Sequence, residues 1–283
     1  MMEPWSLTAS ETLAQIRSGN LSVEAYAKSL LGRILTRNVP TQHNSPLYEK
    51  SFPKVDAASV KILRHASSLI FSKTTTTEFT AIHIGPGTHN PQDPTCIPGG
   101  SSVGSGAAVA LGTQTGGSQS GQPPLLQAHG AIFEQLDLDG DFARLDEWHR
   151  VVLHSEGRTA FLSNYRNVEK RNRKTQLAAF DGIAKLRPRM DKIAGRYAAI
   201  VTPSVPDEAP VGLESTGSHV FCSMWTALHN PVLDIPGFQG HNGMPIGVSL
   251  VAPRYRNRHL LKAGNAVSEI FEAEGGWKPQ VYE

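Results

Sequence analysis

The stretch that decides the fold is PGGSSVGSGAAVALGTQTGGSQSG, residues 98–121. It carries no charged residue, and its Gly and Ser residues flank an apolar run, Ala-Ala-Val-Ala-Leu at 107–111. A flexible Gly/Ser linker would not contain such a run. We therefore predict a short buried helix or strand with a glycine-rich turn at each end. Such turns bring backbone N–H groups close to a bound atom and expose hydroxyl groups, as acyl-transfer chemistry requires.

Three common motifs compete for this stretch. A phosphate-binding loop needs Lys after its last Gly, and Gly117 is followed by Ser118. A dinucleotide-binding fingerprint needs Gly or Ala where Val109 stands. The residues 100–104 fit a G-x-S-x-G nucleophile elbow around Ser102, but Ile97-Pro98-Gly99 does not predict the strand that must precede an elbow.

A fourth interpretation comes from two blocks in fixed order, Gly-Gly-Ser-Ser at 99–102 and Gly-Thr-Gln-Thr-Gly-Gly-Ser at 112–118. Together they resemble the signature of the amidase signature family, serine hydrolases that use a Ser–Ser–Lys triad. The resemblance implies an α/β layered fold with a mixed central sheet covered by helices. It also implies hydrolysis of carboxylic amides, at C–N bonds other than peptide bonds.

The resemblance assigns roles by position. Ser118 is the implied nucleophile, and Ser101 is the implied proton relay, preceded by a cis peptide bond. The backbone N–H groups of Thr115, Gly116 and Gly117, with that of Ser118, would line the oxyanion hole. No cofactor or metal is implied, and the expected partner is a small-molecule amide.

The chain departs from the family pattern at the catalytic base, the lysine of the Ser–Ser–Lys triad. In relatives a strand with a Val/Ile-Lys-Asp motif precedes the Pro-Thr-x-x-x-Ser segment, which stands here at 40–45, and that strand is missing after Ile34. A Ser hydroxyl is a poor nucleophile without a group to take its proton. Lys73 is the only nearby candidate to replace the base. The other lysines around it are expected on solvated surface: Lys50, Lys54 and Lys61.

The rest of the chain indicates one amidase-signature-like domain over 1–283, with a signature block at 35–121 and a C-terminal block at 131–283. Apparent deletions fall near 34/35, near 110/111 and at 119–130, and Ser101 and Ser118 are closer in sequence than the family pattern has them. Lost core strands would leave sheet edges unpaired, so self-association is expected.

Local patterns predict the individual elements. Helices are expected over 8–18, from Ser22 onward, after a cap at Asp56, over 103–110, and from a cap at Asn257 to Phe271. A helix over 176–184 should stop at Arg187-Pro188. Strands are expected at 69–71, 197–203, 231–237 and 244–251. The adjacent acids Asp207 and Glu208 are expected on solvated surface.

Composition bounds the function. A net charge of +2 over 283 residues gives no support for a nucleic-acid or membrane surface. Two cysteines, Cys96 and Cys222, form no disulfide framework, so a reducing, cytoplasmic location is expected. The eleven histidines lack metal-ligand spacing. A Ser–His–Asp triad stays open, because its members need not be adjacent in sequence.

Two further functions remain alternatives to the amidase. One is a catalytically inactive amidase-like remnant, or an incorrectly spliced gene model, that lacks the base. The other is a serine esterase that uses Ser102 in the G-x-S-x-G motif.

Overall fold

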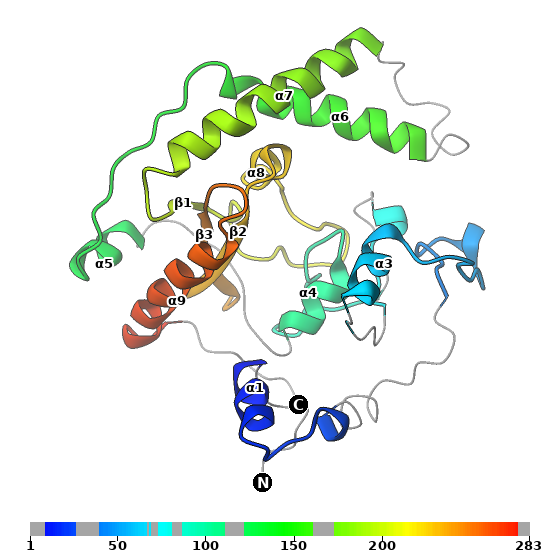
Figure 1. The fold of residues 1–283 in the computed structure, drawn as a ribbon, viewed down its shortest axis with the longest axis horizontal. Helices are drawn as coiled ribbons and strands as arrows, with labels where there is room; N and C mark the ends of the chain where they lie inside the picture. The colour runs from blue at the N-terminus through cyan, green and yellow to red at the C-terminus, as the bar shows by residue number, and fades with distance from the viewer. Residues whose placement is uncertain are drawn as a thin grey trace. The chain divides into compact units, whose positions relative to one another are not determined.

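The computed structural model describes residues 9–26, 40–66, 68, 73–80, 87–110, 122–160 and 173–276 (Figure 1). The chain divides into two compact units, which we describe one at a time. The first comprises Met1–Thr113 and Gly212–Thr216, and the second comprises Gln114–Val211 and Gly217–Glu283.

The first unit is built from short helices joined by irregular segments. Its elements are α1 (Ala9–Arg17), η2 (Pro46–Tyr48), α3 (Ala58–His65), η3 (Glu78–Thr80) and α4 (Val103–Ala110). The helices predicted over 8–18 and 103–110 are therefore confirmed. So is the cap at Ser22, whose Oγ accepts a hydrogen bond from the backbone N of Ala25 at 3.0 Å.

The second unit contains a sheet and the long helices. Its elements are α5 (Gln122–Ala128), η4 (Phe142–Arg144), α6 (Leu145–Ala160), α7 (Arg173–Ala194), β1 (Ile200–Pro203), α8 (Ser223–Leu228), β2 (Val232–Gln239), β3 (Pro245–Val251) and α9 (Asn257–Ala273). The strands predicted at 197–203, 231–237 and 244–251 are confirmed as β1, β2 and β3.

The three strands form an antiparallel sheet in the order β1-β3-β2. One apolar cluster includes Val248, Leu250 and Phe271, and α9 packs on β2 and β3 (Figure 1). Phe271 lies so close to Gly237 that a Cβ there would be 2.6 Å from its ring. Glycine at this position therefore allows the helix to approach the sheet.

A second apolar cluster joins α6, α7 and α8 to β1 and β3. It includes Leu186, Met190, Leu228 and Val251. The α/β class predicted from the sequence is confirmed, and within the described residues the sheet pairs its strands antiparallel.

The predicted end of a helix at Arg187-Pro188 is wrong, because α7 continues through Pro188 to Ala194. Proline removes only one backbone hydrogen bond there. The apolar face of α7 continues on both sides of it, with Leu186 and Met190 buried. Arg187 adds a tertiary contact, since its Nε and Nη2 donate to the carbonyl oxygen of Ala227 at 3.1 and 3.0 Å.

Two predicted caps are also wrong. Ala57 occupies the N-cap of α3, and Asp56 forms an ion pair with Arg64 at 2.9 Å instead. The N-cap of α9 is Arg256, so Asn257 is its first helical residue. Each helix begins one residue away from the predicted position, a shift that sequence patterns do not resolve. The strand predicted at 69–71 lies outside the described residues.

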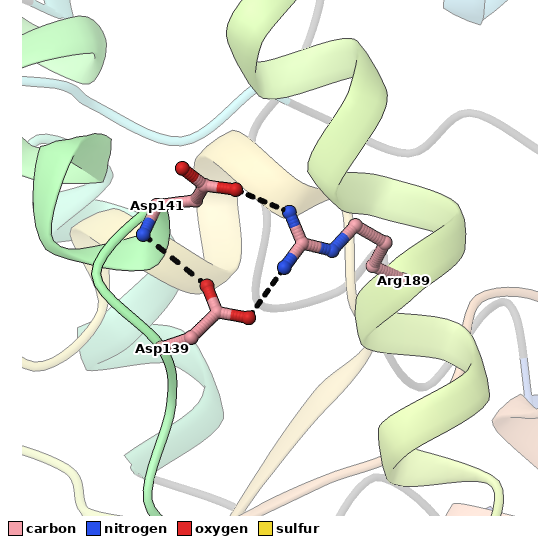
Figure 2. A network of polar contacts seen from close by, with 3 residues as sticks. All are labelled: Asp139, Asp141 and Arg189. Carbon is pink, nitrogen blue, oxygen red and sulfur yellow. Dashed lines mark hydrogen bonds and ion pairs between the residues drawn. The ribbon is translucent and has the colours of Figure 1, made fainter.

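An arginine holds the extended segment 131–139 against α7. Arg189 lies between two carboxylates, with Nη1 at 2.6 Å from Asp141 and Nη2 bonded to Asp139 (Figure 2). The Asp141 backbone N donates to Asp139 at 3.2 Å. The end of this segment, which has no secondary structure of its own, is thus joined to α7.

Candidate active site around Ser101

The signature turn immediately precedes α4. Gly99 has φ +86°, a left-handed conformation that glycine adopts without steric cost, and the Gly100–Ser101 peptide bond is cis. Ser101 is half-buried and Ser102 is exposed. Two residues later Val103, at 1% exposure, begins α4.

The segment 73–80 holds this turn through backbone hydrogen bonds. The N–H of Thr77 donates to the carbonyl of Ser101 at 2.8 Å, and the N–H of Gly104 donates to the carbonyl of Thr75 at 3.0 Å. One hydroxyl pair adds to them, with Thr74 Oγ1 and Ser105 Oγ 2.7 Å apart. A segment distant in sequence therefore fixes the position of Ser101.

The residues 212–216 cover the same turn. The N–H of Gly212 donates to the carbonyl of Thr95 at 3.0 Å, next to the buried Cys96. A Cβ on Gly100 would lie 2.5 Å from Thr216 Cγ2 and 3.3 Å from Thr77 Cγ2. Only glycine fits position 100 without displacing these methyl groups.

The loop that leads into the turn is closed by its own hydrogen bonds. The N–H of Asn90 donates to the carbonyl of Cys96 at 2.9 Å. Asp93 accepts from the Thr95 hydroxyl at 2.7 Å and from the Thr95 N–H at 2.8 Å. Both bonds hold the pKa of Asp93 below its ordinary value, and the bond from the hydroxyl has the larger effect. The loop is thus fixed up to the residues just before Gly99.

Lys73 begins the segment that carries Thr75 and Thr77. Its Nζ donates to Thr41 Oγ1. Thr41 belongs to the Pro-Thr-x-x-x-Ser segment, whose His43 carbonyl accepts from the N–H of Phe79 at 2.8 Å. The structure therefore brings Lys73, that segment and the Ser101 turn into one unit. As predicted, the other three nearby lysines are exposed: Lys50, Lys54 and Lys61.

The remaining residues assigned by resemblance lie outside the described residues. They are Ser118, Thr115, Gly116 and Gly117. Their roles stay predictions.

The esterase alternative loses its structural support. A nucleophile elbow needs a strand before its serine, and residues 97–102 form none. The carbonyl of Ser102 instead accepts from the N–H of Gly106 at 3.0 Å, within the first turn of α4.

The interpretation of Glu208 as solvated surface is wrong. Its side chain is buried at 9% exposure, and its carboxylate accepts from the N–H and Nδ2 of Asn242 at 2.7 Å each and from the N–H of Met244 at 3.1 Å. The proline-rich loop carries this carboxylate into the turn between β2 and β3. Polar residue type alone gave no signal of that contact, because its partners belong to residues 34 and 36 positions away.

Sequence reasoning also missed a polar cluster at the sheet. Asp234 Oδ1 accepts from Ser204 Oγ at 2.7 Å and from Ser249 Oγ, and the two hydroxyl oxygens are 2.7 Å apart. The antiparallel register of Asp234 with Ser249 creates this contact. It satisfies polar groups on a largely apolar strand.

No three metal-ligating side chains gather anywhere in the part of the chain that the structure describes. Two histidines do approach each other, with the rings of His149 and His219 centred 6.5 Å apart. No described helix has both the length and the apolar character needed to cross a membrane.

The fold is that of a mixed α/β protein, and its glycine-rich turn lies in a segment similar to the amidase signature. The Amidase family model matches residues 32–119. A glutamyl-tRNA(Gln) amidotransferase subunit from Lawsonia intracellularis is 35% identical over a region covering 40% of this chain and 27% of its own length. The corresponding protein of Acidothermus cellulolyticus is 43% identical over 29% of this chain and 19% of its own length.

Solved structures show the same fold. Fatty acid amide hydrolase aligns with a TM-score of 0.63 at 13% identity, over 95% of this chain and 85% of its own. The 6-aminohexanoate cyclic dimer hydrolase aligns with a TM-score of 0.62 at 14% identity, over 99% of this chain and 100% of its own. The family-model match confirms the predicted resemblance to the amidase signature family for residues 32–119. The chain spans about a quarter of the length of the first curated relative, 27%.

Proposed function

We propose that this chain is an amide hydrolase of the amidase signature type. The observation that carries the proposal is the Gly100–Ser101 turn, fixed by the segment 73–80 and covered by residues 212–216. Ser118 would attack the carbonyl carbon of a carboxylic amide. Its proton would pass to Ser101 and then, through the base, to the leaving nitrogen, which departs as ammonia or an amine and leaves the acyl group as an ester on Ser118. Attack by water on this ester would release the acid and restore the Ser118 hydroxyl.

The backbone N–H groups of Thr115, Gly116 and Gly117 would stabilise the oxyanion that forms. In hydrolases each such donor contributes about 3 kcal/mol to transition-state stabilisation. Backbone donors of this kind need no charged residue, which agrees with the uncharged stretch 98–121.

Lys73 is the candidate for the base. It is the first residue of the segment that hydrogen-bonds the Ser101 turn, and its amine donates to Thr41 within the same unit. A lysine can act as a base only in its neutral form, so the substrate-bound site would have to exclude water from this amine.

A second candidate, an inactive remnant, is favoured by the same lysine. Lys73 is exposed to solvent and its amine donates to Thr41, whereas the base of this mechanism has to be shielded from water. In that case the fold would persist without turnover.

A fluorophosphonate probe with peptide mapping tests the proposal. The proposal predicts covalent labelling of the folded wild-type chain at Ser118, abolished by Ser118→Ala and reduced by Ser101→Ala. Gly87→Ala serves as the control, because a Cβ there meets nothing within 4 Å. Absence of labelling in folded wild-type protein would favour the remnant.

A further inference from the structure

Thr77 has a buried hydroxyl for which the described residues offer no hydrogen-bond partner. The residue is fully buried, at 0% exposure, and its Oγ1 is unpaired within that part of the chain. Buried hydroxyl groups in proteins are nearly always hydrogen-bonded, because leaving one unpaired is unfavourable. The hydroxyl therefore needs a partner that the described residues do not supply.

Its position is fixed beside the signature turn. The backbone N–H of Thr77 donates to the carbonyl of Ser101 at 2.8 Å, and its methyl group would lie 3.3 Å from a Cβ on Gly100. Thr216 packs on the same glycine. A β-branched side chain has few accessible χ1 values, so a methyl packed against Gly100 also fixes where the hydroxyl points.

We propose that Thr77 is a substrate-binding residue whose hydroxyl hydrogen-bonds the amide held beside Ser101. This inference rests on the proposed function. A threonine hydroxyl both donates and accepts, so it suits a carboxamide, which presents a carbonyl oxygen and N–H groups together. Thr77 would then hold the ligand in place and take no proton, which separates its role from that of Ser101.

Three variants separate a binding role from a structural one. Thr77→Val keeps the branched shape and removes the hydroxyl, whereas Thr77→Ser keeps the hydroxyl and removes the methyl group. Ser45→Ala is the matched control, because Ser45 Oγ is also buried and unpartnered among the described residues. The backbone bonds of Ser45 are to Gln42 and Tyr48.

Protection against fluorophosphonate labelling by increasing concentrations of benzamide gives an apparent dissociation constant for the amide, and labelling without benzamide gives the labelling rate. Thr77→Val should raise the apparent dissociation constant about 10-fold, the loss of one hydrogen bond, with an unchanged labelling rate and melting temperature. Thr77→Ser and Ser45→Ala should retain the wild-type dissociation constant. A Thr77→Val variant that binds like wild type overturns the inference. An equal loss of binding in Thr77→Val and Thr77→Ser, together with a lower melting temperature, also overturns it.

Failure of the proposed function gives a different result. If the folded wild-type chain is not labelled at all, equilibrium binding of benzamide decides the inference. Weaker binding by about 10-fold in Thr77→Val then supports a ligand role for the hydroxyl. Equal binding by the two proteins, or none by wild type, overturns it.

Discussion

The two units of the chain are stabilised in different ways. Both apolar clusters found among the described residues lie in the second unit, built around residues such as Leu228 and Leu250. In the described part of the first unit only Cys96, Ile97 and Val103 are buried hydrophobic residues, while Val55 is 74% exposed. The unit that carries Ser101 is therefore held mainly by backbone hydrogen bonds and close packing at glycine.

The largest effect is expected from a core truncation in the second unit. Leu250→Ala removes a side chain that is 1% exposed in the cluster under α9, and we expect a loss of about 2–5 kcal/mol in the free energy of unfolding. Urea unfolding followed by circular dichroism measures it. The control is Leu261→Ala on α9, where leucine is 60% exposed and little change is expected. Equal losses in the two variants would contradict the placement of the core.

A smaller and local effect is expected at the signature turn. Gly100→Ala places a Cβ 2.5 Å from Thr216 Cγ2, so we expect a loss of about 1–3 kcal/mol, confined to the first unit. Hydrogen exchange should become faster at the N–H groups of Thr77 and Gly104. Gly87→Ala, which meets nothing within 4 Å, should leave exchange unchanged. Uniform acceleration across β3 would show that the two units do not differ as described.

A substitution at Glu208 tests whether polar contacts also stabilise the second unit, which contains the apolar clusters. Glu208→Gln removes the charge from the bonds to Asn242 and Met244, and we expect a loss of about 1–2 kcal/mol in urea unfolding. The matched control is Glu156→Gln on the exposed face of α6. If both variants unfold at the same urea concentration as wild type, the buried carboxylate contributes nothing.

The smallest effect concerns pH. Burial, with a smaller contribution from His219, lowers the pKa of His149 below its ordinary value of 6.5. Since the unfolded chain then binds the proton more readily, this contribution to stability is full above pH 6.5 and declines as the pH falls through that value toward the lower folded pKa.

Thermal unfolding between about pH 7.5 and about pH 5.5 measures this decline. His149→Gln should reduce the fall in melting temperature across this window. An unchanged or steeper fall in the variant would show that His149 does not titrate as described.

The contrast between the units also explains what could be predicted from sequence. The late strands and α4 were predictable, because alternating or helical apolar spacing marks them directly. The continuation of α7 through Pro188 was not, since it depends on tertiary burial of Leu186 and Met190. The burial of Glu208 was not predicted for a related reason: its partners, Asn242 and Met244, are distant in the chain.

At the candidate site, the sequence predicted a role for Ser101 but not the contacts around it. The contacts from Thr77 and Thr216 arise only when segments distant in sequence meet around Gly100. Thr77 is one of four consecutive threonines, and nothing in that run distinguishes the buried hydroxyl from its neighbours. Only the pairing of segment 73–80 with the turn identifies it.

Ammonia release from a panel of small primary amides tests the central claim, that the turn at Ser101 serves amide hydrolysis. The account predicts release by the wild-type chain, loss of it in Ser118→Ala, and a decrease of about 10²–10⁴-fold in Lys73→Met if Lys73 is the base. Circular dichroism should show all three proteins folded. Release by the folded wild-type chain no greater than that by Ser118→Ala would contradict the claim.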